Sequence, residues 1–174
     1  MRKLALLPAA ATLVLCSCGS SGSYPPPAQF AAAAPPDPPL LWVGYPSRGA
    51  RILGEVLVDA ASKGSAWTTQ HPAFAFTLEK AEDLDLFVRF SVHSDTFLHT
   101  GPVTLTVRVN DELIDRPRFD SPGEREYSHL VTAQVLQRQN PAVVRLDVDP
   151  VWTAADGVKL GILLFAVGFE RPGE

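Results

Sequence analysis

Residues 102–110 read "PVTLTVRVN", the clearest alternation of apolar and polar residues in this chain of 174 residues. Apolar side chains stand at every second position from Val103 to Val109, with threonine and arginine between them. Successive side chains of a strand point to opposite faces, so this pattern predicts a strand that is buried on one face. Asn110 and Asp111 follow directly, and both residue types tolerate positive φ. We therefore expect a tight hairpin turn into "ELI" (112–114).

The same alternation recurs on both sides of this segment, in "AFAFTL" (73–78), "LDLFVRFSV" (84–92) and "AVVRLDV" (142–148). The segment "LGILLFAVGF" (160–169) is apolar at nearly every position, as in a central strand that is covered on both faces. Only "HLVTAQVLQRQ" (129–139) has the pattern of a helical turn. Short strands separated by turn residues predict an all-β fold, an antiparallel β-sandwich or jelly roll.

The two cysteines of the chain lie together in "LVLCSCG" (13–19). The side chains of an extended Cys-x-Cys point the same way roughly 6.5 Å apart, so a disulfide would need a strained backbone. A zinc site needs about four ligands, and the nearest histidine is His71. The third interpretation is an export signal, because basic residues and a short apolar run precede the cysteines. That run is too short to span a bilayer of about 30 Å.

The residues "LCSC" (15–18) resemble a bacterial lipobox. The resemblance implies cleavage after Ser17, acylation of Cys18 and anchoring of the mature chain to a membrane. Gly19, which stands where an aspartate would retain the protein, implies the outer membrane of a Gram-negative cell envelope. A plain secretory signal is the alternative. We expect a lipoprotein signal peptide at 1–17, a lipidated Pro/Ala-rich tether at 18–41 and a β-sandwich domain at 42–174.

The tether reads "GSSGSYPPPAQFAAAAPPDPPLL" from residue 19 to residue 41. Such a proline-rich chain favours polyproline II and behaves as a semi-rigid spacer. A ligand for a proline-recognition domain is the alternative, although the proline clusters lack clear basic flanks.

The composition excludes several classes of partner and cofactor. The net charge of −4 argues against nucleic-acid binding, which needs clustered lysine and arginine. The chain contains no glycine-rich phosphate loop, and its histidines lack the spacing of a transition-metal site. We therefore predict no cofactor. A structural calcium ion is the alternative at the carboxylates of Asp147, Asp149 and Asp156, although no calcium-loop pattern is present.

The segment "SVHSD" (91–95) holds a serine, a histidine and an aspartate at alternate positions of an expected strand. Ser91, His93 and Asp95 would share a face as nucleophile, base and orienting group. Parallel side chains about 6.5 Å apart are poorly placed for proton relay, and working triads converge from separate elements. We interpret this face as a solvated strand surface and predict that the protein is not an enzyme.

Aromatic residues in or beside expected loops suggest a binding surface at Trp67, Tyr127 and Trp152. Flat rings stack on the C–H faces of sugars, and neighbouring polar groups bind the hydroxyls. Arg118, with Arg116 beside it, is a candidate hydrogen-bond donor to such a ligand. The alternative is that these rings close the ends of the sandwich.

Three segments resemble galactose-binding-like jelly-roll domains that accompany bacterial glycosyltransferases and polysaccharide-export proteins: "VTLTVRVNDELI" (103–114), "FDSPGEREYSHLV" (119–131) and "VVRLDVDPVWTAADGVKLGILLFAVGFE" (143–170). Asp111 departs from the glycine of that pattern, and Lys159 departs from its arginine. The resemblance implies a non-catalytic binding module for an envelope glycan or a polysaccharide-handling partner. The alternative is an assembly lipoprotein that docks on an envelope protein complex without binding sugar.

Overall fold

The computed structural model describes residues 38–44, 47–57 and 64–173. The expected signal peptide, Cys18 and the tether as far as residue 37 lie outside the described residues. The first strand begins at Leu40, two residues before the expected start of the domain.

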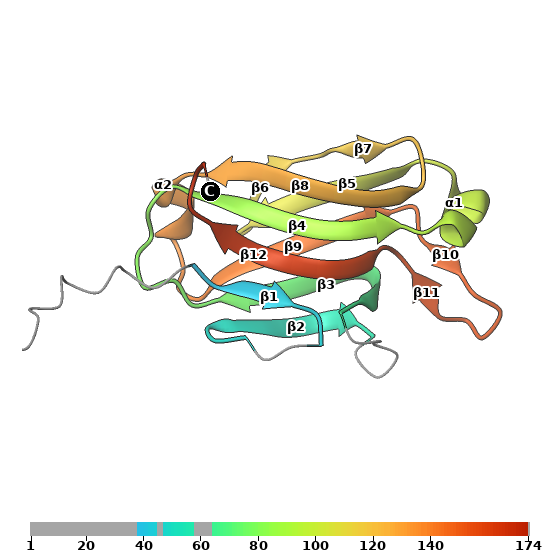
Figure 1. The fold of residues 1–174 in the computed structure, drawn as a ribbon, viewed down its shortest axis with the longest axis horizontal. Helices are drawn as coiled ribbons and strands as arrows, with labels where there is room; N and C mark the ends of the chain where they lie inside the picture. The colour runs from blue at the N-terminus through green and yellow to red at the C-terminus, as the bar shows by residue number, and fades with distance from the viewer. Residues whose placement is uncertain (1–37, 45–46, 58–63, 174) are drawn as a thin grey trace, which may run out of the picture. The chain divides into compact units, whose positions relative to one another are not determined.

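Two antiparallel sheets face each other in this domain (Figure 1). Sheet A contains, in spatial order, β1 (Leu40–Trp42), β12 (Leu163–Glu170), β4 (Leu84–Val92) and β8 (Gly123–Val131). Sheet B contains β2 (Ala50–Val56), β3 (Ala66–Phe76), β9 (Ala142–Asp149) and β5 (Val103–Val109), with β6 (Glu112–Asp115) and β7 (Arg118–Phe119) both paired to β5. The remaining elements are the hairpin β10 (Trp152–Thr153) and β11 (Lys159–Leu160), and two short helices, α1 (Ser94–Thr100) and α2 (Ala133–Leu136).

The long strands β3, β4, β5, β8, β9 and β12 alternate between sheet B and sheet A along the chain, as in a jelly roll. The start of β12 also pairs with β3, at Leu163 opposite Trp67, and this pairing joins the two sheets at one corner. The predicted all-β antiparallel sandwich is confirmed.

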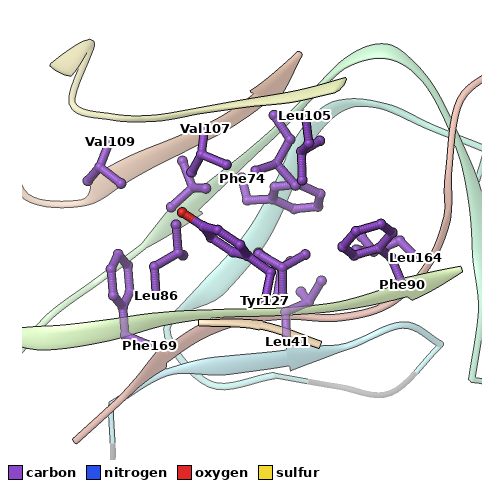
Figure 2. Packing of buried hydrophobic residues seen from close by; sticks show 14 of the residues in the cluster. Leu41, Phe74, Leu86, Phe90, Leu105, Val107, Val109, Tyr127, Leu164 and Phe169 are labelled. Atoms are coloured by element: carbon purple, nitrogen blue, oxygen red, sulfur yellow. The ribbon is translucent and has the colours of Figure 1, made fainter. Parts of the chain in front are cut away.

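The core lies between the sheets and consists of the side chains that alternation placed inward. Every predicted inward residue of β4, from Leu84 to Val92, is buried, and so is every one of β5, from Val103 to Val109. Phe76 of sheet B meets Phe169 of sheet A edge to face, with ring centroids 5.5 Å apart. Figure 2 shows side chains from both sheets meeting in this core.

The predicted central strand is confirmed as β12, which lies between β1 and β4 and is buried along most of its length. The predicted hairpin is also confirmed, because Asn110 and Asp111 have φ of 49° and 67° and β5 pairs with β6. The expected helical turn in 129–139 is shorter, since β8 continues to Val131 and α2 begins at Ala133.

Asn110 joins three segments at the end of the sandwich where α2 lies. It is 8 % exposed, and its Nδ2 donates to the carbonyl oxygen of Val135 at 2.9 Å. Its Oδ1 accepts from the backbone N–H of Val143 at 2.8 Å. One buried amide therefore satisfies backbone groups of both α2 and β9.

No helix among the described residues is long and apolar enough to cross a membrane.

We expect Asn110→Gly to lower the free energy of unfolding by about 1–3 kcal/mol, because the Val143 N–H loses its partner and the Val135 carbonyl oxygen loses one of its donors. Glycine keeps the positive φ accessible, so the loss reports the amide. Asp111→Gly is the matched control, because Asp111 also has a positive φ in the same turn. Its side chain is exposed, and its carboxylate forms an ion pair with Arg145. Its loss should stay within about 1 kcal/mol. Urea unfolding measures both, and equal losses would contradict the role of Asn110.

Candidate functional site

Helix α1 lies at the end of the sandwich opposite α2 (Figure 1). Two tryptophan side chains contact the histidines of this helix. We call this surface the α1 face and define it by five residues: Trp67, His93, Leu98, His99 and Trp152. They come from the start of β3, the N-cap and last turn of α1, and the start of β10.

Helix α1 is fixed by caps at both of its ends. His93 is the N-cap residue, and its Nδ1 accepts the backbone N–H of Asp95 at 3.3 Å. Gly101 ends the helix with φ of 70°, and its N–H donates to the carbonyl oxygen of Phe97 at 2.8 Å. Thr96 is buried beneath the helix and Phe97 packs against the core, so Leu98 and His99 face solvent.

Trp67 lies against the first of the two histidines. Its ring and that of His93 meet edge to face, with centroids 5.3 Å apart and an interplanar angle of 63°. The indole is half-buried, and the backbone of Trp67 pairs with Leu163 of β12. The ring is therefore held by sheet structure on one side and by the cap of α1 on the other.

Trp152 lies against the second histidine. The His99 and Trp152 rings are stacked, with centroids 4.7 Å apart and an interplanar angle of 8°. The imidazole is exposed and covers one face of the half-buried indole. Beside this pair, Leu98 is 80 % exposed. Trp67 and Trp152 thus lie at opposite ends of one short helix.

The hairpin that carries Trp152 lies close to β3 because of Gly161. The N–H of Gly161 donates to the carbonyl oxygen of Thr68 at 2.8 Å. A Cβ atom at this position would stand 2.6 Å from the carbonyl oxygen of Thr69. Glycine is therefore required where the chain leaves β11 and passes close to the backbone of β3.

Arg118 lies at the same end of sheet B as α1. It pairs with Thr104 at the start of β5, and Asp149 pairs with Thr104 from the other side. The Arg118 Nε donates to Asp120 at 2.9 Å on the exposed surface. The structure therefore brings Trp67, Trp152 and Arg118 to one end of the sandwich.

The predicted position of Tyr127 beside a loop is wrong. Tyr127 lies in the middle of β8, is 8 % exposed and belongs to the core (Figure 2). Burial, followed by the negative charge of Asp115, raises the pKa of Tyr127, so the phenol stays neutral. The many polar residues of "GEREYSHLV" hide the apolar alternation by which a strand is predicted. Because the ring is buried, it offers no face to a ligand.

The expected strand face of Ser91, His93 and Asp95 is also wrong. β4 ends at Val92, His93 caps α1, and Asp95 lies in the first helical turn. The Nδ1 atom of His93 accepts a hydrogen bond from the backbone N–H of Asp95. The Oδ2 atom of the Asp95 carboxylate lies 3.8 Å from the same Nδ1. The sequence signal for a helix start here was the run Ser-Asp-Thr after His93, because short polar side chains favour the first positions of a helix.

Polar side chains on the outer face of sheet B form a separate cross-strand network. Glu55 accepts hydrogen bonds from the Thr69 hydroxyl and from the N–H of His71, the latter at 2.7 Å. The His71 Nδ1 lies 2.9 Å from Asp147 Oδ1. The Thr69 hydrogen bond, followed by that from the His71 backbone, lowers the pKa of Glu55. These groups satisfy one another within the sheet.

The carboxylates considered for calcium are partly engaged within the chain. Asp147 pairs with His71, and Asp156 accepts the N–H of Val158 at 3.0 Å in the β10–β11 turn. Within residues 38–44, 47–57 and 64–173, no group of three or more His, Cys, Asp or Glu side chains is placed to hold a metal ion. The calcium alternative stays a prediction.

No protein family matches this sequence, and no curated protein matches it. Among solved structures, the chain is similar to a family 35 carbohydrate binding module from Clostridium thermocellum, with a TM-score of 0.40 and 12% identity over 71% of this chain and 89% of that chain. It is also similar to part of a family GH115 4-O-methyl-alpha-glucuronidase with specificity for decorated arabinogalactans (TM-score 0.41, 11% identity, 71% of this chain and 16% of that chain). A ruminal GH26 endo-beta-1,4-mannanase gives a TM-score of 0.35 and 16% identity, over 66% of this chain and 20% of that chain. These TM-scores lie below 0.5, so the likeness decides neither the fold nor the function of this chain.

We expect Glu55→Gln to reduce stability at neutral pH, because the ionised carboxylate accepts two hydrogen bonds that lower its pKa. This contribution is present above the ordinary glutamate pKa and is lost as the pH falls through the lowered value. The difference from the wild-type chain should therefore shrink in acid. Thermal unfolding at several pH values measures it. The exposed Glu79, changed to Gln, is the control, and a difference that grows in acid would contradict the assignment.

Proposed function

We propose that this chain is a lipid-anchored, non-catalytic binding module of a bacterial envelope, and that its α1 face contacts a glycan. The observation that carries the proposal is the pair of half-buried indoles at the two ends of α1, each in contact with a histidine ring. Polar side chains at the same end of the sandwich are available for hydroxyl groups. They include Asp95 and Arg118.

Glycan binding suits the chemistry of this surface. A pyranose has C–H faces that pack on an indole, and hydroxyls that need donors and acceptors at its edge. The rings stand on strand ends and on a capped helix, so little conformational entropy is lost when a ligand binds. His99 already covers one face of Trp152, and a sugar would contact the remaining surface of the pair or displace the exposed imidazole.

The non-catalytic part of the proposal rests on the arrangement at the start of α1. Ser91 lies on the outer face of β4, opposite Glu124 of β8, whereas His93 turns its Nδ1 to a backbone N–H. A relay needs the base between a nucleophile and an orienting carboxylate. This arrangement supports a structural role for His93 as a cap.

A second candidate function is docking on an envelope protein complex, and the exposure of Leu98 favours it. Leu98 is 80 % exposed on the α1 face. An isobutyl group offers nothing to sugar hydroxyls, but it fills a pocket on a protein partner well. If this alternative holds, Leu98→Ser should reduce the amount of the envelope complex that is pulled down with the tethered chain. Trp67→Ala and Trp152→Ala leave that complex intact.

We expect Trp67→Ala and Trp152→Ala each to weaken glycan binding by about tenfold, because each removes a stacking ring worth ~1.4 kcal/mol. A glycan array of envelope and capsular oligosaccharides finds the ligand, and calorimetry on the full chain measures affinity. Trp42→Ala is the matched control, since Trp42 is 43 % exposed but lies on β1, outside the α1 face. Circular dichroism checks that each variant is folded. Silence across the array, or an equal effect of Trp42→Ala, would contradict the proposal.

We expect Cys18→Ala to abolish incorporation of labelled palmitate and to move the protein from the membrane fraction to the soluble fraction. Several acyl chains anchor a protein stably, and removing their attachment point leaves only weak association. Cys16→Ala is the matched control, because Cys16 belongs to the proposed leader and should not affect labelling. Labelling that survives Cys18→Ala would overturn the assignment of the lipid to Cys18.

A further inference from the structure

We propose that His93 is a proton-dependent cap that couples acid pH to the arrangement of the α1 face. The inference rests on the proposed function for its biological meaning, since the α1 face is the surface assigned there to a glycan. The cap itself is a property of the residues around His93 and can be measured without any ligand.

The cap requires a neutral imidazole. The Nδ1 atom of His93 accepts the backbone N–H of Asp95 at 3.3 Å, so this nitrogen carries no proton, and the ring proton is assigned to Nε2. A protonated imidazole has donors on both nitrogens and cannot accept. Protonation therefore leaves the Asp95 N–H, one of the free donors at the start of α1, without this partner.

The protonated ring has an alternative partner in the Asp95 carboxylate. The Asp95 carboxylate Oδ2 lies 3.8 Å from the same Nδ1, and an imidazolium would donate to it after a small rotation. In the part of the chain that the structure describes, Asp95 is the charged group within ion-pairing distance of His93, and Trp67 of β3 faces it as an uncharged ring. The same ring thus has two arrangements, as a cap when neutral and as a partner of the carboxylate when charged.

The change reaches the α1 face through Trp67. The Trp67 and His93 rings touch edge to face at 5.3 Å, so rotation of the imidazole alters the contact that holds the indole. α1 is only seven residues long, and the His93 side chain is the partner of one of the backbone donors at its start.

A second histidine lies at the other end of α1. His99 lies in the last turn and stacks on Trp152. A positive charge is favourable both at the C-terminal end of a helix and over the face of an indole. A charged imidazole at His99 would therefore keep its contact with Trp152, whereas a charged imidazole at His93 could not remain the cap.

The test follows the Asp95 amide and the Trp67 indole N–H by NMR on the full chain, from about pH 8 to about pH 5, where histidine ordinarily changes charge. Both signals should shift together in the wild-type chain. His93→Asn supplies a non-titrating cap residue of the preferred type, so both signals should stay flat in that variant. His99→Gln is the matched control and should keep the transition. A flat wild-type profile, or an unchanged transition in His93→Asn, would overturn the inference.

A second measurement separates the cap from the proposed function. The affinity of the tightest-binding oligosaccharide from the array is measured in the His99→Gln background, which removes the other histidine of the α1 face. It should fall several-fold in acid when His93 is present and stay constant when His93→Asn is added. If the NMR transition occurs but this affinity is independent of pH, coupling of the cap to glycan binding is overturned. If no oligosaccharide binds at any pH, glycan binding fails, and the Asp95 and Trp67 signals still decide whether the cap exists.

Discussion

The packing of two apolar sheet faces against each other is the constraint on which the rest of this structure depends. The long strands alternate between the sheets, so each one contributes its inward side chains to a single core. Contacts such as that between Phe76 and Phe169 hold the sheets together. Burial of these side chains fixes the register of the long strands, because a shift of one residue would turn the apolar set to solvent. The strand ends, and the elements attached to them, follow from that register.

The two ends of the sandwich are stabilised by different chemistry. At the end with α2, side-chain amides bind backbone groups: Asn110 joins α2 to β9, and Asn140 bonds both the N–H and the carbonyl oxygen of Leu78. At the end with α1, the indoles of Trp67 and Trp152 contact histidines and remain partly exposed. Amide bonds to buried backbone serve stability, whereas half-exposed rings leave surface that a partner can cover.

Period-two alternation predicted the strands whose outer face is polar and whose inner face is uniformly apolar. It succeeded for β4, β5 and β9, and the Asn110–Asp111 turn was readable from residue type. It failed for β8, whose inner face carries Tyr127 and His129 in place of aliphatic residues. It also extended β4 through His93 into the start of α1, because polar residues that cap a helix resemble the polar side of a strand.

The sequence by itself determined the all-β class, most of the buried positions and the turn after β5, because these depend on residues close together in the chain. It also suggested the acylation of Cys18, a galactose-binding-like domain and a glycan ligand, and these remain predictions. Only the tertiary structure decided that Trp67 and Trp152 lie at the two ends of α1 and that Tyr127 is buried. Those positions depend on pairings such as Thr68 with Ile162, 94 residues apart. Local patterns carry no information about which distant strands pair, because that choice is made by the packing of the whole core.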